Sequence, residues 1–204
     1  MKTLVTAGKR NRYCLQKPME YPVKKSLGAL AVITLIVAAT GLLLPEYLVI
    51  PVQGAKISDW NSRSFWFQPW GRSGVHKGID IFAKEGTPAI ASCSGLVVFA
   101  GSIRDGGNCV SILGPKWRIH YYAHLKSIEV KMGDMVSQGR KIGSVGATGN
   151  AVGKPPHLHY SIISQIPYAW RFKFERFGFD RMFYLNPDEK IRKSTPSSQA
   201  DFPF

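Results

Sequence analysis

The 204-residue chain is poor in acidic residues and in cysteine. Its 13 Asp and Glu stand against 27 Lys and Arg, a formal net charge of +14. Three cysteines exclude a disulfide-stapled mini-domain. Hydrophobic residues make up 45% and charged residues 20%, which excludes a disordered chain and a coiled coil. The excess of base indicates an anionic partner, whether nucleic acid, lipid headgroups or an acidic polymer.

Long amphipathic helical patterns are also absent beyond about residue 79, where the hydrophobic pattern has period two. Turn signals such as Asp105-Gly106-Gly107-Asn108 separate the alternating runs. We therefore predict an all-β domain, an antiparallel β-sandwich or barrel-sandwich. A biotinyl or lipoyl carrier domain would use similar strands, but Lys131-Met132 matches its modified lysine poorly. The predicted strands are Ile79–Ala83, Pro88–Ser92, Leu96–Ala100, Cys109–Leu113, Arg118–Ala123 and Leu158–Ile163.

One uncharged apolar run, Leu27–Leu44, has the length of a single membrane span, about 30 Å as a helix. The basic residues before it predict a cytoplasmic N-terminus and an outside location for everything after Pro45. A cleaved signal peptide and a buried soluble helix are the alternatives. The preceding segment holds a single acid, Glu20, among the basic residues Lys2, Lys9, Arg10, Arg12, Lys17, Lys24 and Lys25.

These features divide the chain into predicted regions. Residues 1–26 form a basic cytoplasmic segment, 27–45 the transmembrane helix, and 46–68 a connector with a first strand region. The main domain covers 69–187, with an aromatic and basic insertion at 164–184 and a tail at 188–204. An outside location argues against nucleic acid as partner. It leaves Cys93 and Cys109 as either a pair or two buried thiols, while Cys14 lies inside.

The run from Trp170 to Tyr184, WRFKFERFGFDRMFY, mixes aromatic and basic residues. Such a segment can stack on bases, lie at a membrane interface or cover the core.

Histidines fall in three informative places. His76 and Asp80 stand four residues apart in a loop that enters a strand. His157 and His159 share one face of a strand, about 6–7 Å apart, and can serve one site. Alternation places His120, Tyr122 and His124 on one face as well. His120 is then about 13 Å from His124 and is predicted to be a surface or edge residue.

Taken in order, these motifs resemble the lysostaphin-type zinc metallopeptidases, the M23 or LytM family of peptidoglycan endopeptidases. The resemblance covers about residues 69–163, and Leu185-Asn-Pro187 is similar to the family's closing segment. It rests on His76-Lys-Gly-Ile-Asp-Ile, Gly86-Thr-Pro-Ala-Ile-Ala, Tyr122-Ala-His-Leu, Gly146-Ala-Thr-Gly-Asn and Pro156-His-Leu-His-Tyr.

The resemblance implies that His76, Asp80 and His159 bind one zinc ion and that His124 and His157 are catalytic. Three protein ligands leave a coordination position for water, as in catalytic zinc sites. The H-E-x-x-H helix of other metalloproteases is absent, so His124, His157 or both must handle protons and the oxyanion.

The implied function is a membrane-anchored zinc endopeptidase on the outer side of the bacterial inner membrane, with peptidoglycan as substrate. Some relatives are non-catalytic activators of other wall hydrolases, and a tethered wall-binding scaffold is a third possibility. Because all five site positions are filled, the sequence favours the enzyme.

Overall fold

The computed structural model describes residues 23–194, which divide after Val37 into two compact units. The first unit contains most of helix α1, Val23–Leu43, which coincides with the predicted apolar helix. Among the described residues, no helix is both long and apolar enough to cross a membrane. The predicted span is therefore not confirmed. The predicted segment 1–26 lies largely outside the described residues.

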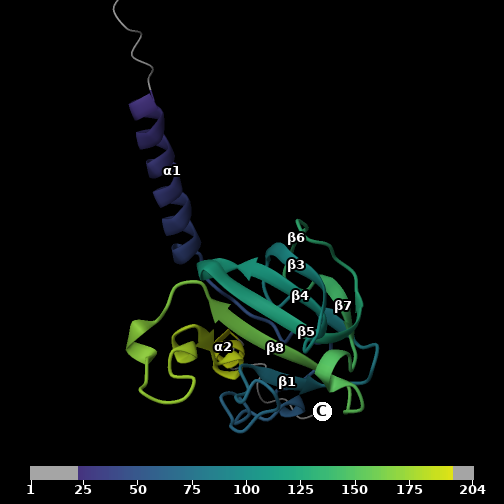
Figure 1. Ribbon diagram of the computed structural model, residues 1–204. Helices are drawn as coiled ribbons and strands as arrows, with labels where there is room; N and C mark the ends of the chain where they lie inside the picture. Colours follow the sequence, from purple (N-terminus) through teal and green to yellow (C-terminus); the bar gives the residue numbers. More distant parts are fainter. Residues whose placement is uncertain (1–22, 195–204) are drawn as a thin grey trace, which may run out of the picture. The chain divides into compact units, whose positions relative to one another are not determined.

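The second unit is built on one antiparallel sheet of nine strands in the described chain (Figure 1). Its main path runs β1-β8-β5-β4-β3-β6, while β7 pairs with β2 and β5, and β9 extends the sheet from β8. The strands are β1 Ile79–Phe82, β2 Pro88–Ile90, β3 Gly95–Ile103, β4 Gly107–Gly114, β5 Arg118–Ile128, β6 Met135–Val136, β7 Lys141–Val145, β8 His157–Ser164 and β9 Tyr184–Leu185.

The antiparallel all-β prediction is confirmed, and each predicted strand is present within a few residues of its expected bounds. Three short strands, β6, β7 and β9, escaped prediction. β7 is only five residues long and contains Gly143, which interrupts the alternating pattern. An added Cβ at Gly143 would lie 2.2 Å from the carbonyl oxygen of Ser127 on β5, so this glycine permits close pairing of the two strands.

The segment expected to be a connector contributes to the core. Leu48, Val52 and Trp60 are buried against strands of the sheet, and Val52 forms an isolated bridge with Ala89. A 3₁₀-helix at Ile57–Asp59 is its only helical turn, and residues 46–68 contain no named strand. The first strand region predicted there is therefore reduced to one bridge.

The predicted insertion follows the end of β8 and forms an exposed loop, with 3₁₀ turns at Ala169–Arg171 and Asp180–Met182. After β9 the chain forms helix α2, Pro187–Ser194, whose Ile191 is fully buried. Asp188 on this helix accepts a hydrogen bond from the Trp60 indole at 2.8 Å. The described start of the predicted tail is therefore packed on the domain, and residues 195–204 lie outside the described part.

Both described cysteines are buried free thiols, so the alternative of a Cys93–Cys109 pair is wrong. Burial raises the pKa of Cys93 to about 12, which keeps its thiol protonated and unreactive.

Candidate metal centre

Three ligand-type side chains converge where β1 meets β8. Asp80 on β1 stands directly opposite His159 on β8, so strand register places their side chains on one face. His76 approaches from the loop before β1. Its Nε2 lies 3.0 Å from Asp80 Oδ1 and 3.1 Å from His159 Nδ1, and the latter is 2.8 Å from Asp80 Oδ1.

Gly78 allows this loop to approach β8. A Cβ at this position would stand 2.4 Å from the carbonyl oxygen of Tyr160 and 2.9 Å from Cε1 of His159. Any side chain would push the loop away from the strand. Glycine between His76 and Asp80 therefore lets both residues reach the same point, although their spacing is not helical.

The outer hydrogen bonds of the two imidazoles fix which nitrogen faces the centre. His76 Nδ1 lies 2.9 Å from the carbonyl oxygen of Ser64, which can only accept, so Nδ1 carries the proton. His159 Nε2 lies 2.9 Å from Ser161 Oγ, a partner to which it can donate. The remaining nitrogens point lone pairs at the Asp80 carboxylate.

A metal ion fits this donor set. Two imidazole nitrogens and one carboxylate oxygen form a group whose atoms all lie within 4.8 Å of one another. Zinc–nitrogen bonds of about 2.0–2.1 Å in a tetrahedron place ligand atoms roughly 3.3 Å apart, close to the separations here. A cation would also relieve the repulsion between lone pairs that face each other. His76, Asp80 and His159 therefore have the chemistry and spacing of a three-residue zinc site.

His124 and His157 lie beside this group. Their ring centroids are 5.0 Å apart, and the His124 ring is 6.0 Å from the His159 ring. The Nδ1 atoms of His124 and His157 face the carbonyl oxygens of Thr148 and Pro155 at 2.9 and 2.8 Å. Each Nδ1 therefore carries a proton, which leaves Nε2 as the nitrogen available to the site.

A bulge in β5 turns His124 toward the site. The register with β8 sets Tyr122 opposite Tyr160 and Ala123 opposite His159. Regular alternation would thus put His124 on the core face with Tyr122, away from His159. Instead His124 has a φ of 63°, and the pairing of β5 with β4 shifts register at this point. The prediction that His120, Tyr122 and His124 share a face is wrong for His124, because the bulge re-aims it.

Burial controls the protonation of the site. Burial, together with the neighbouring His159 and His157, lowers the pKa of His124 to about 4. Burial raises the pKa of Asp80, but His159 and His76 more than offset this, so the net shift is well below the ordinary value. At neutral pH His124 is therefore a neutral base and Asp80 a carboxylate.

The prediction that His120 is a surface residue is wrong. It is fully buried, with Nδ1 2.7 Å from the hydroxyl of Tyr160 and Nε2 3.6 Å from Glu46 Oε1. Glu46 also forms a buried ion pair with Arg118. Alternation along β5 places His120 on the core face, where this polar group surrounds it.

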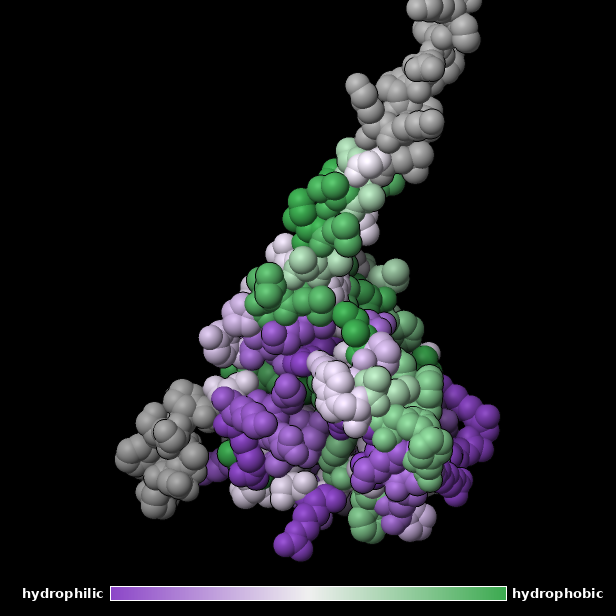
Figure 2. Space-filling model, turned by 90° about the vertical axis from the view of Figure 1, so that its left-hand side faces the viewer, coloured by the Kyte–Doolittle hydropathy of each residue, from purple (hydrophilic) through white to green (hydrophobic). Residues whose placement is uncertain are grey.

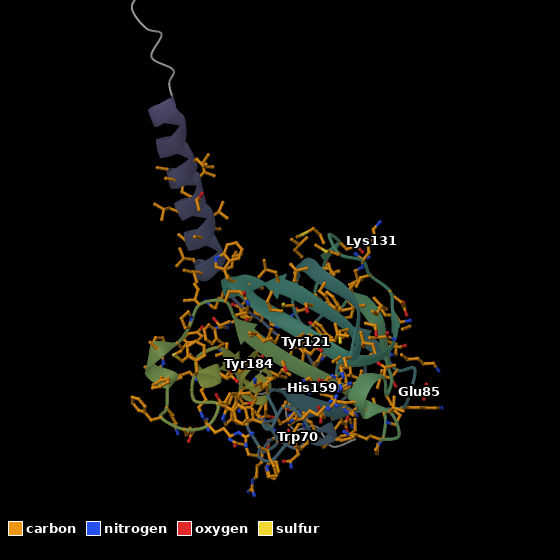
Figure 3. The ribbon with its side chains drawn as sticks, in the orientation of Figure 1. Trp70, Glu85, Tyr121, Lys131, His159 and Tyr184 are labelled. Carbon is orange, nitrogen blue, oxygen red and sulfur yellow. The ribbon has the colours of Figure 1, made fainter. Side chains whose placement is uncertain are left out.

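Sequence reasoning missed the residues that support the site. Trp70 stacks on His76 with ring centroids 4.1 Å apart, and the Tyr121 ring lies 6.3 Å from that of His159 (Figure 3). Ser64 offers a backbone carbonyl, which leaves no sequence signal. Ser161 lies two residues beyond His159 on the same strand face, and that spacing could have identified it.

The antiparallel sheet and its His–Asp–His cluster define the class as a β domain with a candidate three-residue metal site. Residues 74–168 match the sequence model of Peptidase family M23.

Named relatives agree with the family. The chain is 40% identical over 114 residues to the L-Ala–D-Glu endopeptidase of Bacillus subtilis, covering 52% of this chain and 35% of that protein. It is 40% identical over 92 residues to the peptidoglycan DD-endopeptidase ShyA of Vibrio cholerae, covering 45% and 21%. The chain thus spans about a third or less of these relatives.

Among solved structures, the chain is similar to the catalytic domain of lysostaphin from Staphylococcus simulans. The TM-score is 0.54 at 28% identity, covering 67% of this chain and 95% of that one. Trp170 and the rest of the loop up to β9 lie beyond the family match, as does α2.

Proposed function

We propose that this chain is a zinc-dependent endopeptidase that hydrolyses peptide bonds in peptidoglycan. The observation that carries the proposal is the convergence of His76, Asp80 and His159 beside His124 and His157. The endopeptidase relatives supply the substrate class, and the net charge of +9 over residues 51–204 suits an anionic wall polymer.

The residues divide into a metal-holding set and a proton-handling set. Zinc bound to His76, Asp80 and His159 would polarise the scissile carbonyl and lower the pKa of a bound water. His124 and His157 present their Nε2 atoms beside that place, so either can accept a proton from the attacking water. Once protonated, the same nitrogen can donate to the oxyanion or to the leaving amine.

A direct test is hydrolysis of purified sacculi by the full chain, with the zinc content measured on the same sample. The proposal expects about one zinc per chain and release of peptide fragments. Zinc without hydrolysis would indicate the wall-binding scaffold. Stimulation of a second hydrolase without intrinsic hydrolysis would indicate the activator.

We further propose that residues 27–45 anchor the chain in the bacterial inner membrane, with the domain on the outer side. The support is the uncharged run Leu27–Leu44 and the basic segment before it. A reporter fused after Phe204 should be active only outside the cytoplasm. Activity inside would contradict both the topology and a role in the wall, and a mature N-terminus near residue 45 would indicate a cleaved signal.

A further inference from the structure

The loop between β8 and β9 exposes aromatic side chains, which folded proteins usually bury. Phe174 is 99% exposed, Trp170 80% and Phe179 63%. Ile166 and Phe172 are exposed beside them in the sequence. Figure 2 views the side of the domain that carries this loop, and hydrophobic side chains gather there among hydrophilic ones. Large exposed apolar patches of this kind mark interaction surfaces.

Cations alternate with these aromatic residues. Lys173 and Arg176 are exposed, and the Arg176 guanidinium lies 4.8 Å from the centre of the Phe177 ring. Alternating aromatic and basic side chains are typical of segments that lie in the headgroup region of a bilayer. There the rings bury in the acyl boundary while the cations meet lipid phosphates.

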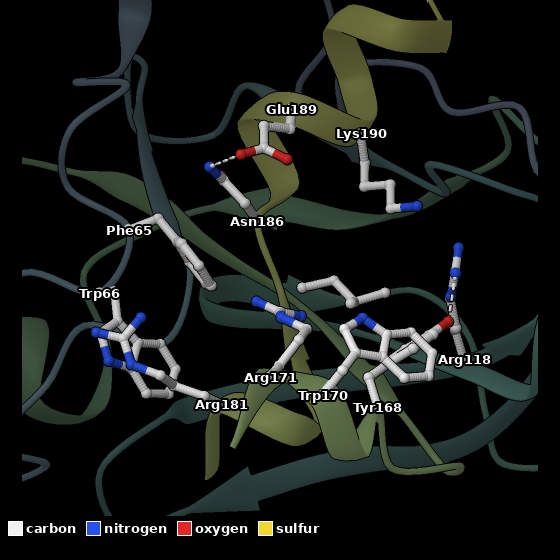
Figure 4. Close-up of a pocket in the computed structure, with 11 residues that line it drawn as sticks. Phe65, Trp66, Arg118, Tyr168, Trp170, Arg171, Arg181, Asn186, Glu189 and Lys190 are labelled. Atoms are coloured by element: carbon white, nitrogen blue, oxygen red, sulfur yellow. Dashed lines mark hydrogen bonds between the residues drawn. The ribbon is translucent and has the colours of Figure 1, made fainter. Parts of the chain in front are cut away.

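A cationic cavity of about 580 Å³ adjoins the loop (Figure 4). Burial lowers the pKa of Arg171, Glu189 partly offsets this, and Arg181 lowers it again; burial, followed by the charge of Arg118, lowers the pKa of Lys190. These cations crowd one another, so a bound anion would stabilise them. The cavity is lined by Phe65, Trp66, Arg118, Tyr168, Trp170, Arg171, Arg181, Leu185, Asn186, Glu189 and Lys190.

Two buried donors that line the cavity also have no partner among the described residues, Trp66 Nε1 and Arg118 Nε. Trp66 is only 9% exposed and Arg118 only 4%. The lining carries four cations, Arg118, Arg171, Arg181 and Lys190, against one carboxylate, Glu189. The cavity therefore favours a ligand that carries negatively charged oxygens, such as a phosphate.

Contacts of Arg118 connect the loop to the end of the predicted anchor. Glu46 follows the apolar run by two residues and pairs with Arg118, whose Nη2 donates to the Tyr168 hydroxyl at 2.7 Å. Tyr168 stands at the start of the exposed aromatic run. If Leu27–Leu44 spans a bilayer, residues 166–179 therefore begin close to the point where the chain leaves it.

We propose that residues 166–179, with the adjoining cavity, form a docking surface for the anionic phospholipid face of the membrane. The rings of Trp170, Phe172 and Phe174 enter the interface, and Arg171 and Lys190 bind a headgroup phosphate. The placement of this surface rests on the proposed anchor. A protein partner or a wall polymer on the same patch would give different results in the test below.

The test uses the full chain reconstituted in vesicles of phosphatidylcholine, with or without added phosphatidylglycerol, that contain lipids brominated along the acyl chain. Flotation first measures whether the protein is bound to the vesicles. Tryptophan emission is then compared between the wild type and Trp170→Phe, so that the difference reports Trp170 alone. Added phosphatidylglycerol should produce quenching of that component, and raised salt should reduce it.

The double variant Phe172→Ser/Phe174→Ser should lose this quenching. The matched control is Met132→Ser/Met135→Ser, which changes two side chains that are 73% and 70% exposed and lie outside residues 166–179. This control should keep the quenching of Trp170. Floated protein with an unquenched Trp170 overturns the docking surface but leaves the anchor intact. Failure to float with anionic vesicles overturns both. Quenching in protein that alkaline carbonate extracts supports the surface and contradicts the anchor.

Discussion

The metal centre depends on hydrogen bonds that lie one step outside it. Ser161 Oγ faces His159 Nε2 at 2.9 Å, and the Ser64 carbonyl accepts from His76 Nδ1 at 2.9 Å. Each contact holds one tautomer and one ring orientation, so that the other nitrogen keeps its lone pair directed at the proposed metal position. Such outer partners orient the metal-binding imidazole, and their loss weakens metal binding.

Ser161→Ala should weaken zinc binding about 10–100-fold, because it removes the acceptor that orients His159. The measurement is a zinc titration against a competing chelator. Ser102→Ala, at an exposed position on β3, is the control and should bind zinc like the wild type. Equal affinities for all three proteins would show that Ser161 does not position the ligand.

At the scale of strands and loops, alternation in the sequence was sufficient to predict six of the nine strands, while the ligand set came from the family resemblance. Asp80 and His159 meet because β1 and β8 are adjacent and antiparallel. The bulge at His124 was not predictable, because a left-handed φ of 63° at a non-glycine residue has no sequence signature. The burial of His120 was also missed, since its partner Glu46 belongs to a segment expected to be a connector.

The Glu46 contacts give a second prediction, about stability. Burial raises the pKa of Glu46, but His120 and Arg118 outweigh it, and the net pKa in the folded state is lowered. Because the pKa of Glu46 is lower in the folded than in the unfolded protein, the ionised carboxylate stabilises the fold at pH values above the unfolded pKa of 4.5. This stabilisation is lost as the pH falls through the folded pKa. Glu46→Gln should lack this pH dependence and should be destabilised by about 3–5 kcal/mol at neutral pH.

Urea unfolding at neutral and acidic pH measures both effects. Glu129→Gln is the matched control, since Glu129 pairs with Lys141 at 2.8 Å with both side chains more than a third exposed. Its loss should cost at most about 1 kcal/mol. A Glu46→Gln protein as stable as the Glu129→Gln protein would contradict the structural role of the buried pair.

For the whole molecule, the sheet and the metal centre are separable. The core is formed by apolar side chains along the strands and by Leu48, Val52 and Trp60, none of which is a ligand. A β core of this size buries enough surface to stay folded without the metal. Removal of zinc should therefore abolish hydrolysis while circular dichroism and cooperative unfolding persist, and added zinc should restore activity. Hydrolysis that continues after verified metal removal would contradict the metalloenzyme assignment.

The central claim is that His159 holds the metal while His157, two residues away on β8, handles protons. It is tested most directly by measuring zinc content and sacculus hydrolysis for His159→Ala, His157→Ala and His124→Ala, prepared in parallel. His159→Ala should lose most of its zinc together with its activity. His157→Ala and His124→Ala should keep about one zinc per chain, while turnover falls by about 10²–10⁴-fold. Loss of zinc from His157→Ala with retention in His159→Ala would exchange the two roles, and zinc and activity unchanged in all three variants would contradict the site.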